Sequence, residues 1–212
     1  YKGLSFTTIM NQGDYINIII KSVLSSILLG AVLAIIVLAL FLKDIRPTIV
    51  VAFSIPFSVL FAIIIMYFTG ININVMSLAG LCLGIGMLVD NSIVVMENIY
   101  RFRNEGMSAS KAAVRGTAQV AGPILASTIT TICVFLPMVY TSGMVSQLLM
   151  PFAFTISYAL IASLLVALTV VPTMGSVLLR KTKDVKQPWF DKIKDVYGKV
   201  LELALRFKIV PL

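Results

Sequence analysis

The sequence lacks histidine altogether and has little charge and little cysteine. Charged residues make up 12% of its 212 residues and hydrophobic residues 59%. Without His, zinc sites built on imidazole and a His general base are excluded. Cys82 and Cys133 both fall within apolar segments, which argues against a structural disulfide. A Gly-x-x-x-x-Gly-Lys loop is also missing, so nothing indicates that the chain uses ATP.

Long uncharged runs take up most of the chain and raise its mean hydropathy to +1.01. Residues 22–42, 47–89 and 116–179 carry no charge. About 20 apolar residues are enough to cross a membrane, and turn-forming residues interrupt the second run at Gly70 and the third at Gly143. We therefore expect an all-α polytopic bundle over residues 22–179, with five transmembrane helices at about 22–42, 48–69, 74–98, 119–140 and 149–179.

The segments on either side of this bundle have a different character. Residues 1–21 mix polar and apolar residues, as expected for the end of an extracytoplasmic domain and a lead-in helix. Residues 180–205 predict an amphipathic helix at the membrane interface, with Trp189 and Tyr197 at headgroup level. A soluble helix packed on another domain is the alternative. Residues 206–212 read as the start of a further membrane helix, and we expect the chain to be a fragment.

Two local features give further expectations. Ser108 predicts the start of a short helix before the fourth span, with Ala109, Ala112 and Ala113 on its surface. Prolines inside the later spans are expected near helix ends, where they are tolerated best; Pro123 is one of these.

Lysine and arginine are distributed unevenly among the connections between the expected spans. The second and fourth connections have none, and nine Lys and Arg residues follow Leu179. The first and third connections contain Lys43, Arg46, Arg101, Arg103, Lys111 and Arg115. This asymmetry predicts that the first and third connections and the C-terminal tail are cytoplasmic. The net charge of +8 therefore reflects membrane topology, and we do not expect nucleic-acid binding.

An acid interrupts the third expected span. Asp90 follows a glycine-rich stretch that contains Gly80, Gly84 and Gly86. A carboxylate in hydrocarbon costs several kcal/mol unless it is protonated, paired or wetted, so such a residue is a functional candidate. Helical spacing places Glu97 on the face of Asp90 and Asn98 on the face of Asn91. The glycines allow close approach of another helix.

Structural roles compete with functional ones at each of these positions. Asp90 and Asn91 could hydrogen-bond between helices, and Glu97 could pair with Arg101 at i+4. On the fourth expected span, Ser127, Thr128, Thr130 and Thr131 form a hydroxyl face. These hydroxyls either bond to carbonyls of their own helix or form an accessory polar route to Asp90. The ten Met residues are scattered and indicate packing rather than a metal site.

The segment Gly84-Ile-Gly86-Met-Leu-Val-Asp90-Asn91-Ser-Ile-Val-Val-Met-Glu97-Asn98 resembles the fourth membrane helix of the resistance–nodulation–division (RND) superfamily, most closely its hydrophobe/amphiphile multidrug branch. Leu42-Lys-Asp-Ile-Arg46-Pro47 and Phe135-Leu-Pro137-Met resemble other parts of the same half. The resemblance implies about the second to sixth helices of a twelve-helix permease that exports drugs or amphiphiles against proton entry. The commonest family motif has two adjacent acids, and here only Asp90 of the pair is an acid.

The resemblance also implies the rest of the system. It predicts a transporter in the inner membrane rather than an enzyme, with Asp90 and Asn91 at the proton translocation site and no cofactor beyond the proton gradient. A missing second half would supply a Lys partner, and a homotrimer, a periplasmic adaptor and an outer-membrane channel are the expected partners besides the lipid bilayer and small-molecule substrates. A metal-exporting or protein-export relative and a non-transporting membrane scaffold remain alternatives.

Overall fold

The computed structural model describes residues 12–42, 45–179, 197–198 and 201–202. The chain divides into two units, residues 1–182 and residues 183–212, and the fold is that of the first unit. Within its described part lie five helices: α1 (Gln12–Leu42), α2 (Ile45–Thr69), α3 (Val75–Asn104), α4 (Ala109–Val139) and α5 (Met144–Leu178). Each contains a stretch long and apolar enough to cross a membrane. The prediction of an all-α membrane fold is confirmed.

The turns between the helices follow from local chemistry. Asn74 begins α3 as an N-cap: its Oδ1 accepts from the Ser77 N–H at 2.8 Å, and the Ser77 hydroxyl accepts from the Asn74 N–H at 2.7 Å. This reciprocal pair satisfies two donors that a helix start leaves open. Gly70 and Gly143 precede α3 and α5 with φ of 72° and 75°, a conformation that costs glycine little.

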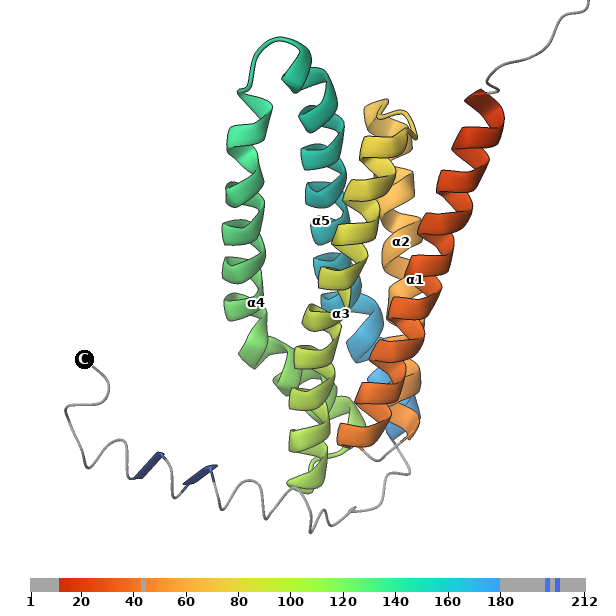
Figure 1. Cartoon of the computed structure of the whole chain (residues 1–212). Coiled ribbons are helices and arrows are strands. Elements are labelled where there is room, and N and C mark those ends of the chain that lie inside the picture. The colour runs from red at the N-terminus through yellow and green to blue at the C-terminus, as the bar shows by residue number, and fades with distance from the viewer. Residues whose placement is uncertain (1–11, 43–44, 180–196, 199–200, 203–212) are drawn as a thin grey trace, which may run out of the picture. The chain divides into compact units, whose positions relative to one another are not determined.

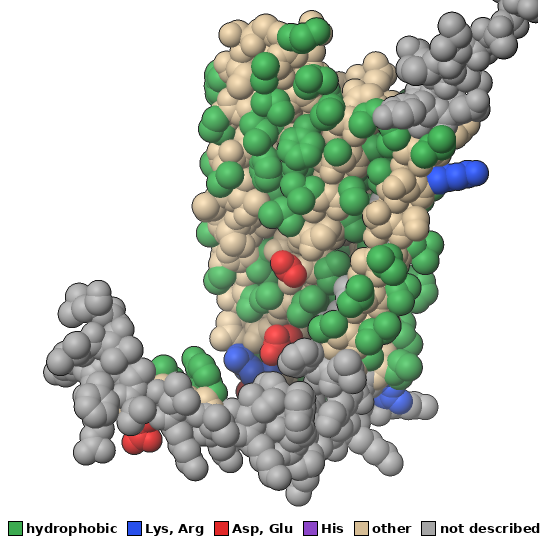
Figure 2. Space-filling view, in the orientation of Figure 1, with side chains coloured by type: hydrophobic (Ala, Val, Ile, Leu, Met, Phe, Trp, Pro, Cys, Tyr) green, Lys and Arg blue, Asp and Glu red, His purple; other side chains and the backbone are tan. Residues whose placement is uncertain are grey.

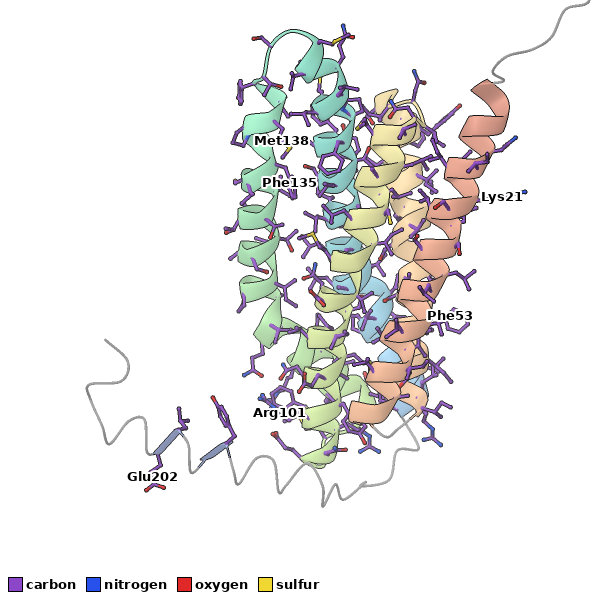
Figure 3. All side chains as sticks on the ribbon, in the orientation of Figure 1. Lys21, Phe53, Arg101, Phe135, Met138 and Glu202 are labelled. Carbon is purple, nitrogen blue, oxygen red and sulfur yellow. The ribbon has the colours of Figure 1, made fainter. Side chains whose placement is uncertain are left out.

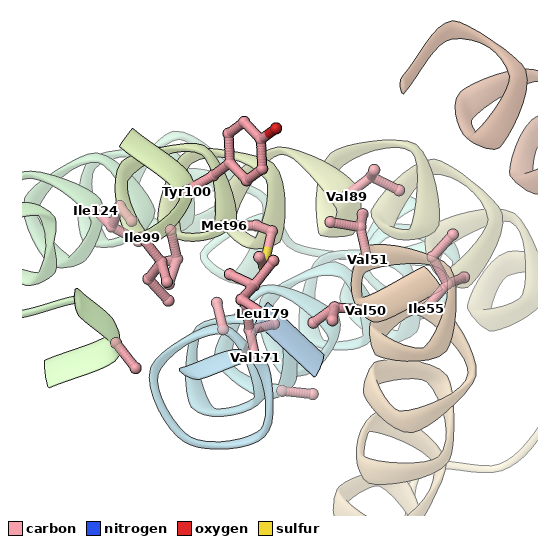
Figure 4. Close-up of a cluster of buried hydrophobic side chains, with 14 of the residues drawn as sticks. Val50, Val51, Ile55, Val89, Met96, Ile99, Tyr100, Ile124, Val171 and Leu179 are labelled. Atoms are coloured by element: carbon pink, nitrogen blue, oxygen red, sulfur yellow. The ribbon is translucent and has the colours of Figure 1, made fainter. Parts of the chain in front are cut away.

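Helix α3 is the centre of the bundle and contacts all four other helices (Figure 1). Its Met96 and Ile99 are fully buried and lie among side chains of α5 such as Val171 (Figure 4). Small residues allow this close packing: a Cβ added at Gly80 would lie 2.7 Å from the Phe152 carbonyl oxygen, and one at Gly84 would lie 2.8 Å from the Ala159 Cβ. Between membrane helices, such contact replaces the hydrophobic effect as a source of stability.

The α3–α4 turn is tied to the end of α5. Arg103 donates from Nε to the Leu179 carbonyl and from Nη1 to the Met107 carbonyl, both at 3.0 Å. Gly106 turns the chain with φ of 93°. We call this end of the bundle, with Arg46, Arg101, Arg103, Lys111 and Arg115, the basic end.

Helix α4 differs from the expectation. The short helix predicted after Ser108 and the fourth span are one helix of 31 residues, and Ala109, Ala112 and Ala113 are buried rather than on a surface. They pack in the core because the first part of α4 crosses the other helices before the helix bends (Figure 1). Pro123 consequently lies inside α4 and not near an end.

The remaining helices extend past the predicted spans. The lead-in helix and the first span are one helix, because α1 begins at Gln12, and α3 continues to Asn104. The predicted interfacial helix at 180–205 lies outside the described residues except at 197–198 and 201–202, and the further membrane helix at 206–212 lies wholly outside them.

Candidate functional site

The acidic residue Asp90 lies near the middle of α3, on the one face of that helix left open by its neighbours. The exposed positions recur every three or four residues and are Ala79, Leu83, Gly86, Asp90, Val94, Glu97 and Arg101. Figure 2 shows acidic side chains within a surface that is otherwise hydrophobic or uncharged over most of its height. Asp90 and Glu97 thus share the face that their spacing predicted.

Asp90 has no ion pair or hydrogen bond among the described residues. The neighbouring Gly86 is equally open, because a Cβ added there would meet no atom within 4 Å. Gly80 and Gly84 face α5, whereas Gly86 faces away from all the described helices. A packing role for Gly86 therefore stays a prediction and needs a partner from outside these residues.

The next residue, Asn91, points to a different neighbour. Its Nδ2 lies 3.4 Å from the Oγ1 of Thr128 on α4. Thr128 is only 4% exposed, and Asn91 is half-buried. The two adjacent residues therefore differ in environment: Asp90 is open and Asn91 is held by α4.

The other hydroxyls of α4 bond within their own helix. Ser127 donates to the Ile124 carbonyl at 3.0 Å, and Thr130 and Thr131 each donate at 2.9 Å to the carbonyl four residues earlier. Of the four hydroxyl residues, Thr128 is the one that meets α3. The accessory polar route through this face stays a prediction.

A second contact between α3 and α4 lies seven residues further along, and sequence reasoning missed it. Asn98, 8% exposed, donates from Nδ2 to the Gly116 carbonyl at 2.7 Å and to Gln119 Oε1 at 3.2 Å. Arg101 Nη2 donates to the same Gln119 oxygen at 3.0 Å. The signal was present, because Asn98 repeats the position of Asn91 after two helical turns.

The contact depends on a glycine. A Cβ at Gly116 would lie 2.9 Å from the Ile99 Cα, so only glycine lets the backbones of α3 and α4 come this close.

The pairing of Glu97 with Arg101, one of the alternatives for Glu97, does not form in the structure. Arg101, at the basic end of α3 (Figure 3), pairs with Glu105, with 3.7 Å between Nε and Oε1. Glu97 and Glu105 both lie four residues from Arg101. The Arg101 side chain bonds to Gln119 as well as to Glu105. Glu97 is left without this partner on the open face of α3. Both side chains of the Arg101–Glu105 pair are more than half exposed, so it adds little stability.

These groups determine which chemistry the site can perform. A carboxyl group in a membrane-spanning helix can gain or lose a proton, whereas the amide of Asn91 cannot. Among the described residues, no group of three or more His, Cys, Asp or Glu side chains could hold a metal ion. Of the two adjacent residues, Asp90 is therefore the one whose side chain could exchange a proton.

Comparison with known proteins finds similar sequences over nearly the whole chain. The AcrB/AcrD/AcrF family profile matches residues 2–212. Swarming motility protein SwrC of Bacillus subtilis is 35% identical over 98% of this chain. Multidrug resistance protein MdtC is 36% identical over 79% of the chain in Escherichia coli O139:H28 and 33% identical over 88% in Enterobacter sp. 638. The chain spans 20%, 16% and 19% of these three relatives, respectively.

Proposed function

Because the chain belongs to the AcrB/AcrD/AcrF family of RND permeases, which are transporters and not enzymes, we propose that it is part of a proton-driven exporter of drugs or amphiphilic small molecules. The observation that carries the proposal is Asp90, an acid in the middle of a membrane helix with no partner among the described residues. The relatives named for multidrug resistance support this substrate class. Most of the permease lies outside this chain and would supply the substrate contacts.

In the proposed cycle, Asp90 alternates between a charged and a neutral state. A proton that crosses a potential of 100 mV releases about 2.3 kcal/mol, which shifts a two-state equilibrium roughly fiftyfold. The proton gradient is the energy source, and no bound cofactor takes part. In this cycle, the open face around Gly86 and Asp90 receives a helix from another part of the permease, and that helix supplies the cation for the charged state.

Asn91 has a different role in this proposal. Its amide does not titrate, and its contact with Thr128 on α4 makes it a positioning residue beside Asp90. The departure from the two-acid family motif leaves Asp90 as the only acid of the adjacent pair. Glu97, on the same open face, is an accessory group nearer the basic end.

Orientation and assembly complete the proposal. The protein is a multi-pass membrane protein. In this proposal its basic end faces the cytoplasm, because Lys and Arg gather at that end, and the membrane that it crosses is the inner membrane. The family suggests a homotrimer with a periplasmic adaptor and an outer-membrane channel as partners.

The proton role is tested with Asp90→Asn in the full-length permease. This substitution keeps the shape of the side chain and removes its charge change, so drug efflux should be lost while expression and membrane insertion stay normal. Glu97→Gln is the matched control, since it makes the same change on the same helix face, and it should retain most of the export. Full export by Asp90→Asn would refute the proposal.

A further inference from the structure

Helix α4 is too long for the membrane alone. Its 31 residues extend about 46 Å at 1.5 Å per residue, whereas the hydrocarbon core is ~30 Å thick. Its C-terminal part is the apolar span, and so about ten residues at its start reach the interface. Figure 1 shows this start crossing the basic end before α4 bends to run along the bundle. Pro123, which lacks an N–H, explains a bend.

The start of α4 has two opposite faces. Ala109, Ala112, Ala113 and Gly116 are buried, and Gly116 lies against Ile99 of α3. The opposite face is exposed and contains four residues at helical spacing i, i+3, i+4 and i+7. We call these four residues the basic stripe: Lys111, Val114, Arg115 and Ala118. The close contact at Gly116 fixes the rotation of the helix and therefore keeps the stripe directed away from the bundle.

The cations of the basic stripe differ from their neighbours. Arg101 bonds to Glu105 and Gln119, and Arg103 bonds to two carbonyls. Lys111 and Arg115 have no ion pair or hydrogen bond within the described part of the chain. Between them Val114 is 69% exposed. This combination suits the membrane–water interface. There, long basic side chains reach the lipid headgroups, and apolar side chains enter the boundary of the acyl chains.

We propose that the basic stripe of α4 binds the phosphate headgroups of anionic phospholipids, with Val114 at the acyl boundary. Charge complementarity selects anionic over zwitterionic lipid, and the position at the end of an apolar span places the stripe at headgroup depth. Each basic residue near an anionic surface contributes ~1 kcal/mol, equivalent to about fivefold in affinity. The inference does not depend on the proton role of Asp90.

The test uses the full-length permease in nanodiscs, with Val114→Cys carrying a fluorophore and all other cysteines replaced by Ala. Nitroxide-labelled phosphatidylglycerol and phosphatidylcholine serve as quenchers. Phosphatidylglycerol should quench more strongly. The preference for phosphatidylglycerol is the ratio of its quenching to that of phosphatidylcholine. This ratio should fall about fivefold for each charge removed, by Lys111→Gln or by Arg115→Gln. Exchanging the two cations, Lys111→Arg with Arg115→Lys, should preserve it.

Lys21→Gln is the matched control, because it removes one positive charge from α1, away from the basic end (Figure 3), and should leave the preference unchanged. Equal quenching by both lipids would overturn the proposal. Quenching by aqueous iodide alone would show that the stripe faces water. Protection from both lipid and iodide would show that a protein segment covers it, which also overturns lipid binding.

Discussion

At the scale of single residues, Asp90 and Asn91 show how one step along a helix changes the chemistry available to a side chain. Successive residues of an α-helix point about 100° apart, so Asp90 faces the open side of α3 and Asn91 faces α4. The carboxyl group is the one without a partner among the described residues. The non-titrating group is the one held by Thr128.

Restoring the second acid of the commoner family motif tests this division. Asn91→Asp in the full-length permease should retain at least partial export, because the Thr128 hydroxyl can donate to a carboxylate as readily as it accepts from an amide. Drug efflux and proton uptake are measured together. Thr128→Val, which removes this partner, serves as the control and should weaken export in the Asn91→Asp background. Complete loss of export in normally expressed Asn91→Asp would contradict the role given to Asn91.

At the scale of helices, α3 and α4 are joined at two points on either side of Pro123. Asn91 meets Thr128 beyond the proline, and Asn98 meets Gly116 and Gln119 before it. The start of α4 is buried on α3, but beyond Thr128 no residue of α4 is buried among the described residues. The firm attachment of α4 is therefore at the basic end, where backbone contact is closest.

Two glycines of α4 provide a matched test of this attachment. Gly116→Ala should destabilise the permease by ~1–3 kcal/mol, the typical cost of overpacking, because its Cβ would lie 2.9 Å from the Ile99 Cα. The Cβ added by Gly122→Ala would have no atom within 4 Å, so this variant should not lose stability through overpacking. Thermal unfolding of the purified permease should separate the two variants by several degrees. Equal melting temperatures would mean that α3 and α4 do not approach so closely.

At the scale of the whole molecule, the helices form one end rich in cations and an opposite end with uncharged turns. The turn residues Asn72 and Ser142 lie between α2 and α3 and between α4 and α5, whereas Asn104 ends α3 at the basic end. The face of α3 that contains Asp90 is open among the described residues. In the proposed permease, a further helix covers it.

Labelling from each side of the membrane tests the orientation. In a cysteine-free full-length permease, single cysteines introduced by Asn72→Cys or Ser142→Cys should react with an impermeant maleimide added outside the cells. Asn104→Cys should react only after the membrane is opened, because the basic end is retained in the cytoplasm. Reaction of Asn104→Cys in intact cells would reverse the proposed orientation.

The sequence by itself determined the class of the protein and the candidate acid. Long uncharged runs and the position of Asp90 are properties of the chain alone, since any 20-residue apolar run must satisfy its backbone within a membrane helix. It also allowed the family to be recognised from the motif around Asp90, and the comparisons confirm that assignment.

Only the tertiary structure decided which faces meet. Gly84 packs on α5 and Gly86 on no described residue, although both glycines read alike in the sequence. Ala112 and Ala113 are buried where a surface was expected, and Arg101 pairs with Glu105 rather than Glu97. Spacing along a helix determines which residues share a face, but the rotation of that helix against its neighbours depends on contacts between distant segments, such as Ile99 with Gly116.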